Sequence, residues 1–280
     1  MHIKQLPDGS AYLNVGAGSH FHPDWTNIDL VSTAPEVIAH NILKGLPYAA
    51  STFDAVYHSH VLEHLNRADG KRMIAECFRV LKPGGVIRVV VPDLAYVCHR
   101  YVQLYTEAQA APDDPVKAER HEWALINVID QMVRTTPGGE LGRFVTRPNL
   151  LDKEFIRSQG TLLDEMTRAK PAPSVSLVTR LKRATPGKVW RILKNRALLA
   201  LLGESYRLAL YRQRGEIHLW MYDALSLRHL LEDIGFTAVQ MMTAETSRIP
   251  DWETYQLDMN ADGVIRKPHS LFAEALKPST

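Results

Sequence analysis

Cysteine is scarce in this sequence of 280 residues, which has only Cys77 and Cys98. Two isolated thiols do not make a disulfide framework or a zinc site of cysteines, so we expect a protein of the reducing cytoplasm. Long apolar runs are lacking too. No run approaches the roughly 18 residues of a membrane span. No basic start leads into an apolar stretch either, so we predict neither a spanning helix nor a signal peptide.

The composition excludes a disordered or fibrous chain. Hydrophobic residues make up 45% and charged residues 23%, which are ordinary values for a globular protein. The net charge of +2 conceals an uneven distribution. Residues 168–214 hold 12 Lys and Arg against one acid, Glu204, so a basic segment lies within an otherwise acidic chain. The sequence has no internal repeat and no low-complexity tract.

Strand and helix patterns alternate over the first hundred residues. Short apolar or β-branched runs predict strands at 11–15, 26–29, 36–40, 53–58 and 86–91. The last run, VIRVVV, is almost wholly apolar, as is typical of a parallel strand buried on both faces. Before it, apolar residues at helical spacing from Met73 to Leu81 predict a helix that stops at the KPGG of Lys82–Gly85. This alternation predicts a parallel sheet covered by helices.

The alternation stops near residue 95. From there to about residue 215 the sequence favours helices and offers no convincing strand. A helix from Asp223 to Gly235, the strand FTAVQMM and a last strand in SLFAEALKP follow. We therefore predict one α/β domain formed by residues 1–94 and 216–280. A helical, partly basic insertion at 95–215 interrupts it after the fifth strand and serves as a lid or acceptor region.

A glycine-containing loop follows the first predicted strand in AYLNVGAGSHFHPDWTNIDL, residues 11–30. Gly16 and Gly18 would let the backbone approach a ligand, with N–H groups directed at its carboxylate or phosphate. Asp29 ends the second strand, where its carboxylate can accept both hydroxyl protons of a ribose. A dinucleotide fingerprint fails, because Phe21 occupies the third glycine position and Asp29 follows too soon. The loop therefore predicts a nucleoside-bearing cofactor other than NAD.

Four motifs occur in order along the chain: YLNVGAGS, NIDL, HNILKGLPYAASTFDAVYHSHVLEHL and ECFRVLKPGGVIRVVVPD. As a set they resemble the class I S-adenosylmethionine-dependent methyltransferases of the type-11 group, over residues 11–94 and again over 218–276. The segment LDMNADGVIRKPHSLFAEALKP also looks like a bacterial subgroup associated with surface polysaccharides. The resemblance implies a Rossmann-like class I methyltransferase fold. Its mostly parallel seven-stranded sheet has the order 3-2-1-4-5-7-6, helices on both faces and a first helix of roughly two turns.

The resemblance also implies S-adenosylmethionine as the cofactor. The cofactor-binding residues that it assigns by matched position are Asn14, Gly16, Ala17, Gly18, Asp29, Asn41, Ile42 and His60. The glycine loop would surround the methionine part, Asp29 would bind the ribose, and Asn41 with Ile42 would read the adenine. Asn14 and Asn41 are amides where the family usually has acids. They keep hydrogen bonding but lose the attraction to the ammonium group of the cofactor.

Histidines gather where the implied strand order reverses, a place where ligands bind. His58, His60, Glu63 and His64 follow the fourth strand, and the last three share one face if the segment is helical. Three interpretations stay open. The side chains could be structural lining of the pocket, or His60 or His64 could be a general base for an acceptor hydroxyl. The segment could also hold a metal, since ubiquinone-biosynthesis O-methyltransferases carry a similar E-x-x-E-H.

The chain around the end of the insertion offers further candidates. His218, Trp220 and Tyr222 could line the acceptor site, although Trp220 could equally fill the core beneath the lid. The basic amphipathic stretch 188–214 could be a lid helix with a solvated face. It could also lie on an anionic membrane surface near a lipid-linked substrate, form a homo-oligomer contact, or grip nucleic acid. No RNA-binding motif supports the last of these.

The stretch DMNADGVIRKPH at 258–269 starts like a calcium loop. Its twelfth position is His269, where a calcium loop needs a bidentate Glu. We therefore predict a turn before the last strand, with no calcium.

Taken together, these features predict an S-adenosylmethionine-dependent O-methyltransferase. Its acceptor would be a glycan or another sugar-containing molecule, small or lipid-linked, in the cytoplasm or at the inner membrane surface. The cofactor would supply the methyl group, and the protein would supply orientation and deprotonation. Two alternatives stay open. Asn14 and Asn41 would suit a cofactor-binding partner protein without transfer activity, and the basic insertion would suit a methyltransferase acting on RNA or protein.

Overall fold

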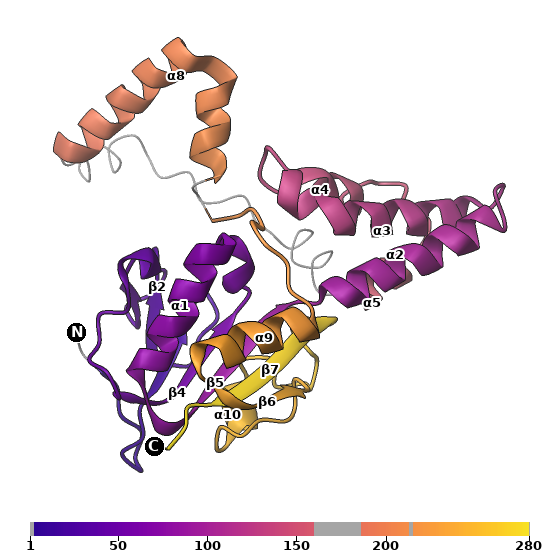
Figure 1. Cartoon of the computed structure of the whole chain (residues 1–280). Coiled ribbons are helices and arrows are strands. Elements are labelled where there is room, and N and C mark those ends of the chain that lie inside the picture. Colours follow the sequence, from indigo (N-terminus) through magenta and orange to yellow (C-terminus); the bar gives the residue numbers. More distant parts are fainter. Residues whose placement is uncertain (1–2, 160–185, 213–214, 280) are drawn as a thin grey trace.

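The computed structural model describes residues 3–159, 186–212 and 215–279. Within them lies a seven-stranded sheet in the order β3-β2-β1-β4-β5-β7-β6 (Figure 1). Its ladders are parallel except at β7, which pairs antiparallel with β5 and with β6. This is the Rossmann-like class I methyltransferase fold, and the strand order that the resemblance implied is confirmed.

The predicted strands all form, and most of their ends agree with the sequence patterns. Their bounds are β1 Tyr12–Val15, β2 Thr26–Asp29, β3 Val37–Ala39, β4 Phe53–Ser59, β5 Leu81–Pro92, β6 Thr237–Met242 and β7 Ser270–Leu276. The exception is β5, which begins before its apolar run. Leu81 pairs with Phe53 and Val86 with Ala55, so residues 82–85 bulge out of the ladder instead of ending the preceding helix cleanly.

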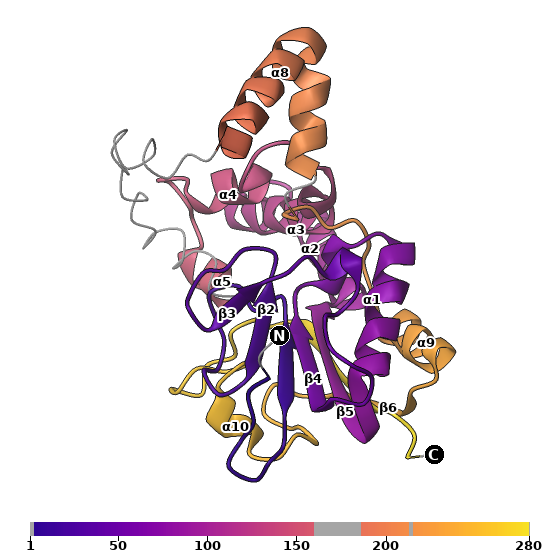
Figure 2. The ribbon, with the colours of Figure 1, turned by 90° about the vertical axis from the view of Figure 1, so that its left-hand side faces the viewer.

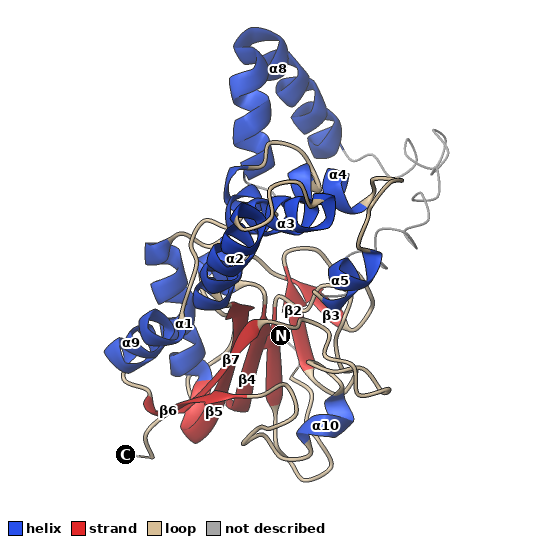
Figure 3. Cartoon of the chain, turned by 90° about the vertical axis from the view of Figure 1, so that its right-hand side faces the viewer, coloured by secondary structure: helices blue, strands red, loops and turns tan. Residues whose placement is uncertain are grey.

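Hydrophobic layers cover both faces of the sheet. Helices α1 (Arg67–Val80) and α9 (Ala224–Ile234) pack on one face through apolar residues at helical spacing (Figure 3). The opposite face is covered by the short α10 (Trp252–Tyr255) and the loops around it. There Trp25 and Trp252 meet edge to face with ring centroids 6.3 Å apart. Both faces of the sheet are therefore covered by hydrophobic clusters.

The expected first helix does not form. Residues 16–25 are all described, and they make turns between β1 and β2. Gly16 and Gly18 have φ angles of +72° and +57°, which a right-handed helix does not contain. Pro23 lacks an N–H group, and so the short segment favours turns over a helix. The prediction of a helix of roughly two turns was therefore wrong.

Between β5 and α9 the elements formed by the described residues are helices, with no strand among them. The helices are α2 Leu94–Gln109, α3 Pro115–Val133, α4 Gly139–Val145, α5 Lys153–Ser158 and α8 Pro186–Arg212. The helices α2 to α5 share a buried cluster of their own, which includes Leu104, Trp123, Phe144 and Phe155. Figure 2 shows α8 farthest from the sheet. This separate cluster supports the division into residues 1–94 with 216–280 and an insertion at 95–215, which stays a prediction.

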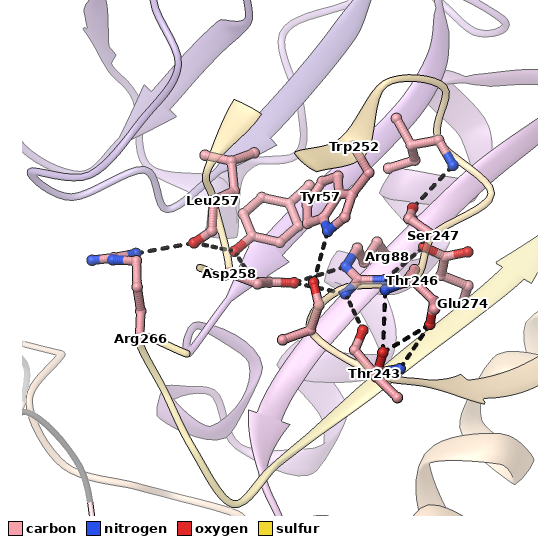
Figure 4. Close-up of polar contacts among 12 residues, drawn as sticks. Tyr57, Arg88, Thr243, Thr246, Ser247, Trp252, Leu257, Asp258, Arg266 and Glu274 are labelled. Carbon is pink, nitrogen blue, oxygen red and sulfur yellow. Dashed lines mark hydrogen bonds and ion pairs between the residues drawn. The ribbon is translucent and has the colours of Figure 1, made fainter. Parts of the chain in front are cut away.

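A buried charge network ties the sheet to its α10 face (Figure 4). Arg88 on β5 donates to Oδ2 of Asp258 and to Oε1 of Glu274 on β7, each at 2.8 Å. The hydroxyl of Tyr57 donates to Oδ1 of Asp258 at 2.6 Å. The guanidinium also lies 4.4 Å from the ring centroid of Trp252. Asp258 is therefore engaged inside the protein and not exposed for a calcium ion.

The segment after Asp258 forms the predicted turn. The N–H of Gly263 donates to the carbonyl of Asn260 at 3.0 Å, and the N–H of Asn260 donates to the carbonyl of Val264 at 2.9 Å. An isolated bridge between Met259 and Ile265 closes it.

Candidate cofactor and acceptor site

Asp29 joins the end of β2 to the glycine loop. Its Oδ2 accepts from the N–H of Gly18 at 2.9 Å, and its Oδ1 accepts from the N–H of Val31 at 3.1 Å. The hydroxyl of Thr33 donates to the carbonyl of Gly18 and holds the loop from its other side. An ionised carboxylate has about four lone-pair sites, so the half-buried Asp29 keeps acceptor capacity for the two hydroxyls of a ribose.

The N–H groups of the glycine loop serve the protein itself. Those of Gly16 and Ala17 donate to the carbonyl of Ile28 at 2.8 and 3.1 Å, and that of Gly18 donates to Asp29. The expectation that these groups point at an anion of the ligand is therefore wrong. The loop offers space instead, because a Cβ added to Gly18 would meet no atom within 4 Å. This open side fits a ligand that packs against the backbone.

The remaining predicted cofactor residues lie on both sides of this loop. Asn14 is buried in β1, and its amide donates to Oδ1 of Asn27 at 3.1 Å. Asn41 caps a short 3-10 helix, η1 (Ile42–Lys44), because its Oδ1 accepts from the N–H of Leu43 at 3.0 Å. The NH₂ group of Asn41 could thus donate to a ring nitrogen of adenine. Ile42 packs against the core at half-burial.

His60 occupies a strained turn directly after β4. Its φ angle is +54°, and its N–H donates to the carbonyl of Val90 at 2.9 Å, which anchors the turn to β5. Its Nδ1 lies 3.2 Å from Oε1 of Glu63, and its Nε2 lies 3.0 Å from Oγ of Ser270 on β7. A single 3-10 turn, η2 (Leu62–His64), follows in place of the longer helical face that the spacing suggested. The structure nevertheless brings His60 and Glu63 together.

Glu63 is a carboxylate enclosed by imidazoles. It is 0% exposed, and among the described residues neither of its oxygens meets hydrogen-bond geometry, although Nδ1 of His60 approaches Oε1 closely. Burial alone would raise the pKa of Glu63, but His60, His64 and His218 outweigh it and keep the pKa below its ordinary value. His58 is buried beside them, and burial lowers its pKa to about 4.

His218 reaches this cluster from the segment directly after the insertion. Its ring lies 4.9 Å from the ring of His64 between centroids, and the next residue, Leu219, donates its N–H to the carbonyl of Glu63 at 2.7 Å. Trp220 is 40% exposed beneath Arg67 and does not fill the core. Tyr222 is the side chain that packs into the core instead. Sequence reasoning missed the approach of His218 to Glu63, since no local pattern links positions so far apart.

A cavity of about 140 Å³ lies between the carboxyl edge of the sheet and helices α2 and α3. His60 and His218 belong to its wall, together with a ring stack of Tyr96 on His269 at 4.2 Å and 5°. The other lining residues include aromatic, amide and cationic side chains: Arg100, Trp123, Asn127, Gln131, Gln159 and Ser270. The Nε2 side of His60 thus borders a space for a second molecule.

Part of the chain is similar to known methyltransferases. Residues 24–89 match the model of the methyltransferase domain family. A probable S-adenosylmethionine-dependent methyltransferase of Mycolicibacterium smegmatis is 43% identical over 56 residues, or 20% of this chain. The match spans only 21% of the length of that relative.

Three solved structures align with the chain at low identity. A putative methyltransferase complexed with the Trm112 activator, from Haloferax volcanii, has a TM-score of 0.38 and 11% identity, over 99% of this chain and 85% of its own. A possible histamine N-methyltransferase of Thermotoga maritima has a TM-score of 0.37 and 11% identity, over 97% and 84%. The N-methyltransferase NodS of Bradyrhizobium japonicum, solved with S-adenosylhomocysteine, has a TM-score of 0.26 and 19% identity, over 33% and 57%. These alignments carry no argument. The strand order gives the class I methyltransferase fold, and residues 24–89 match the methyltransferase domain family.

Proposed function

We propose that this chain is an S-adenosylmethionine-dependent methyltransferase that transfers the methyl group to a hydroxyl of a sugar-containing acceptor. The observation that carries the proposal is the contact of His60 with Glu63 at 3.2 Å, on the wall of a cavity beside the expected cofactor site. The family match over residues 24–89 supports the cofactor. The buried carboxylate supports a base rather than a merely structural histidine, because it orients the imidazole that borders the cavity.

The bound cofactor supplies an electrophilic methyl group on its sulfonium. Asp29 would accept the ribose hydroxyls, Asn41 would face the adenine, and the open side of Gly18 would receive the methionine part. His60 would keep its Nδ1 proton toward Glu63, so that Nε2 holds the lone pair next to the cavity. That nitrogen would take the proton of the acceptor hydroxyl. Orientation of the two molecules would contribute most, up to about 7–11 kcal/mol in favourable cases.

The lining of the cavity supports a sugar-containing acceptor. The stacked Tyr96 and His269 and the indole of Trp123 offer flat apolar faces, which suit the C–H face of a pyranose ring. Asn127 and Gln131 offer amides that both donate and accept, as sugar hydroxyls require.

Calorimetric titration with S-adenosylmethionine and S-adenosylhomocysteine tests the cofactor. We expect micromolar binding that is lost in Asp29→Ala and kept in Asp24→Ala, because Asp24 is an exposed carboxylate nearby. Release of S-adenosylhomocysteine is then followed with sugar nucleotides, lipid-linked glycans and simple phenols as acceptors. Binding without turnover on any of them would favour a partner protein without transfer activity. Turnover on RNA or protein would overturn the sugar acceptor but not the cofactor.

The tip of α8 supports a lipid-linked acceptor at a membrane surface. The helix bends at Gly203, where φ is +57° and ψ is −137°. Leu199, Leu201 and Leu202 precede the bend and are 41%, 78% and 52% exposed. Exposed Arg207 lies one turn after the bend, where it forms an ion pair with exposed Glu204. No described helix is long and apolar enough to cross a membrane. An apolar tip on a helix that also carries the exposed Lys194 is typical of contact with an anionic lipid surface.

Flotation of the full chain with vesicles tests this contact. Binding to vesicles with anionic phosphatidylglycerol should exceed binding to phosphatidylcholine alone, and Leu201→Ser/Leu202→Ser should abolish the difference. Leu225→Ser is the control, since this leucine of α9 is 62% exposed away from the tip. Concentration-dependent dimerisation that the tip variant abolishes, without vesicle binding, would assign the tip to a homo-oligomer contact instead.

A further inference from the structure

We propose that Glu63, His64 and His218 form a site for one divalent transition-metal ion such as zinc. One ligand atom from each of the three side chains can be chosen so that all three lie within 4.8 Å of one another. Spacing of this kind lets three donors reach a common ion. The proposal goes beyond the methyl transfer proposed above and does not depend on it.

The carboxylate provides the first argument. Glu63 is fully buried, and among the described residues neither oxygen has a hydrogen-bond partner. A buried carboxylate without hydrogen bonds is costly unless a positive charge neutralises it. His60 approaches one oxygen at 3.2 Å, and the carboxylate has acceptor capacity left for a cation.

The two imidazoles provide the second argument. Nδ1 of His64 lies 3.1 Å from the carbonyl of Ile217, which can only accept, so Nδ1 carries the proton and Nε2 keeps its lone pair. Metal-binding histidines are oriented in this way, with the other ring nitrogen bonded to a carbonyl or carboxylate. His218 is 5% exposed, and its ring lies 4.9 Å from that of His64 between centroids, so both imidazoles lie within reach of the same ion.

The backbone holds the third ligand in place. The N–H groups of Leu219 and Trp220 donate to the carbonyl of Glu63 at 2.7 and 3.2 Å, and the N–H of His218 donates to the carbonyl of Gln131 at 2.9 Å. These bonds fasten the segment after the insertion onto the η2 turn and onto α3. The segment that follows the insertion thereby completes a donor set that the turn begins.

The donor set selects the class of ion. Two nitrogens and one carboxylate are typical of zinc and related ions, whereas calcium and magnesium prefer oxygen ligands. Three protein ligands leave a fourth position of a tetrahedral ion open. Because His218 also lines the acceptor cavity, such an ion would border that cavity, and His60 would remain the base of the proposed transfer.

The test uses the full chain after dialysis against a chelator. Zinc is titrated in competition with a chromophoric chelator, and we expect one tight site per chain that weakens at least about 100-fold in His218→Asn and in Glu63→Gln. His229→Asn is the matched control, because His229 is an exposed histidine on α9. Circular dichroism confirms that each variant is folded. Equal affinity of His218→Asn and the unchanged chain would overturn the site.

A second measurement needs no variant. Cobalt replaces zinc in the unchanged chain, and a four-coordinate site should show strong visible absorption that one equivalent of zinc displaces. Absorption of weak, six-coordinate type would overturn the proposal and leave Glu63 paired only with His60. Cofactor binding is measured on the same metal-free and metal-loaded samples, so a failure of the metal site is distinguished from a failure of the methyltransferase proposal.

Discussion

Arg88 on β5 and Asp258, which lie 170 residues apart in the chain, form a buried ion pair at 2.8 Å. The guanidinium also holds Glu274, and neither carboxylate has appreciable contact with water. One arginine thus pairs with two buried carboxylates from different segments. The network belongs to the framework of the sheet rather than to the site.

Arg88→Met should destabilise the protein strongly. Removing the guanidinium leaves Asp258 and Glu274 buried without their partner, and breaking a buried ion pair in this way costs about 3–5 kcal/mol. Urea unfolding followed by circular dichroism measures the loss. The control is Lys82→Met, because Lys82 and Asp54 are 38% and 36% exposed. That exposed pair should contribute at most about 1 kcal/mol, and similar losses in both variants would contradict the expectation.

Gly16→Ala should lower both stability and cofactor affinity. Its φ angle is +72°, and an added Cβ would lie 2.3 Å from Cγ2 of Val61. The double variant Gly16→Ala/Val61→Ala removes the clash but not the backbone strain, so it should recover part of the loss. Thermal melts and calorimetric titration measure the two effects. No recovery in the double variant would show that the clash with Val61 is unimportant.

His60→Gln should lower kcat by about 10²–10⁴-fold if His60 is a general base. The affinity for S-adenosylhomocysteine should then stay nearly unchanged, since the base acts on the acceptor. His99→Gln on the exposed side of α2 is the control. A loss of cofactor affinity with unchanged kcat would instead assign His60 to the lining of the cofactor pocket, the other role that its position implies.

The two cysteines should differ sharply in reactivity. Cys77 is buried in α1, and burial raises the pKa of its thiol to about 12. The thiolate, formed when the thiol loses its proton, is the species that reacts, so Cys77 stays inert near pH 8. Cys98 on α2 is exposed. Titration with a disulfide reagent should modify one thiol quickly and the second only after unfolding, and two fast thiols in the native protein would contradict the packing of α1.

Much of the fold is predictable from local sequence patterns. The apolar run of β5 suffices to predict a strand, and the helical spacing around Met73 suffices to predict a helix, because periodicity follows from the geometry of each element. The turn at residues 258–265 follows from its Asn and Gly. The missing first helix shows the limit of analogy, since Gly16, Gly18 and Pro23 disfavour the helix that the family resemblance implied.

Some features of the candidate site are likewise predictable from the sequence, whereas others depend on the tertiary structure. The sequence by itself determined the glycine loop, the acid at Asp29 and the histidines after β4, because these lie at strand ends whose order a parallel sheet constrains. Tertiary structure alone decided that the loop N–H groups turn inward, that Arg88 finds Asp258, and that His218 meets Glu63. Such contacts join distant segments, and their partners are selected by the packing of the whole chain rather than by any local period.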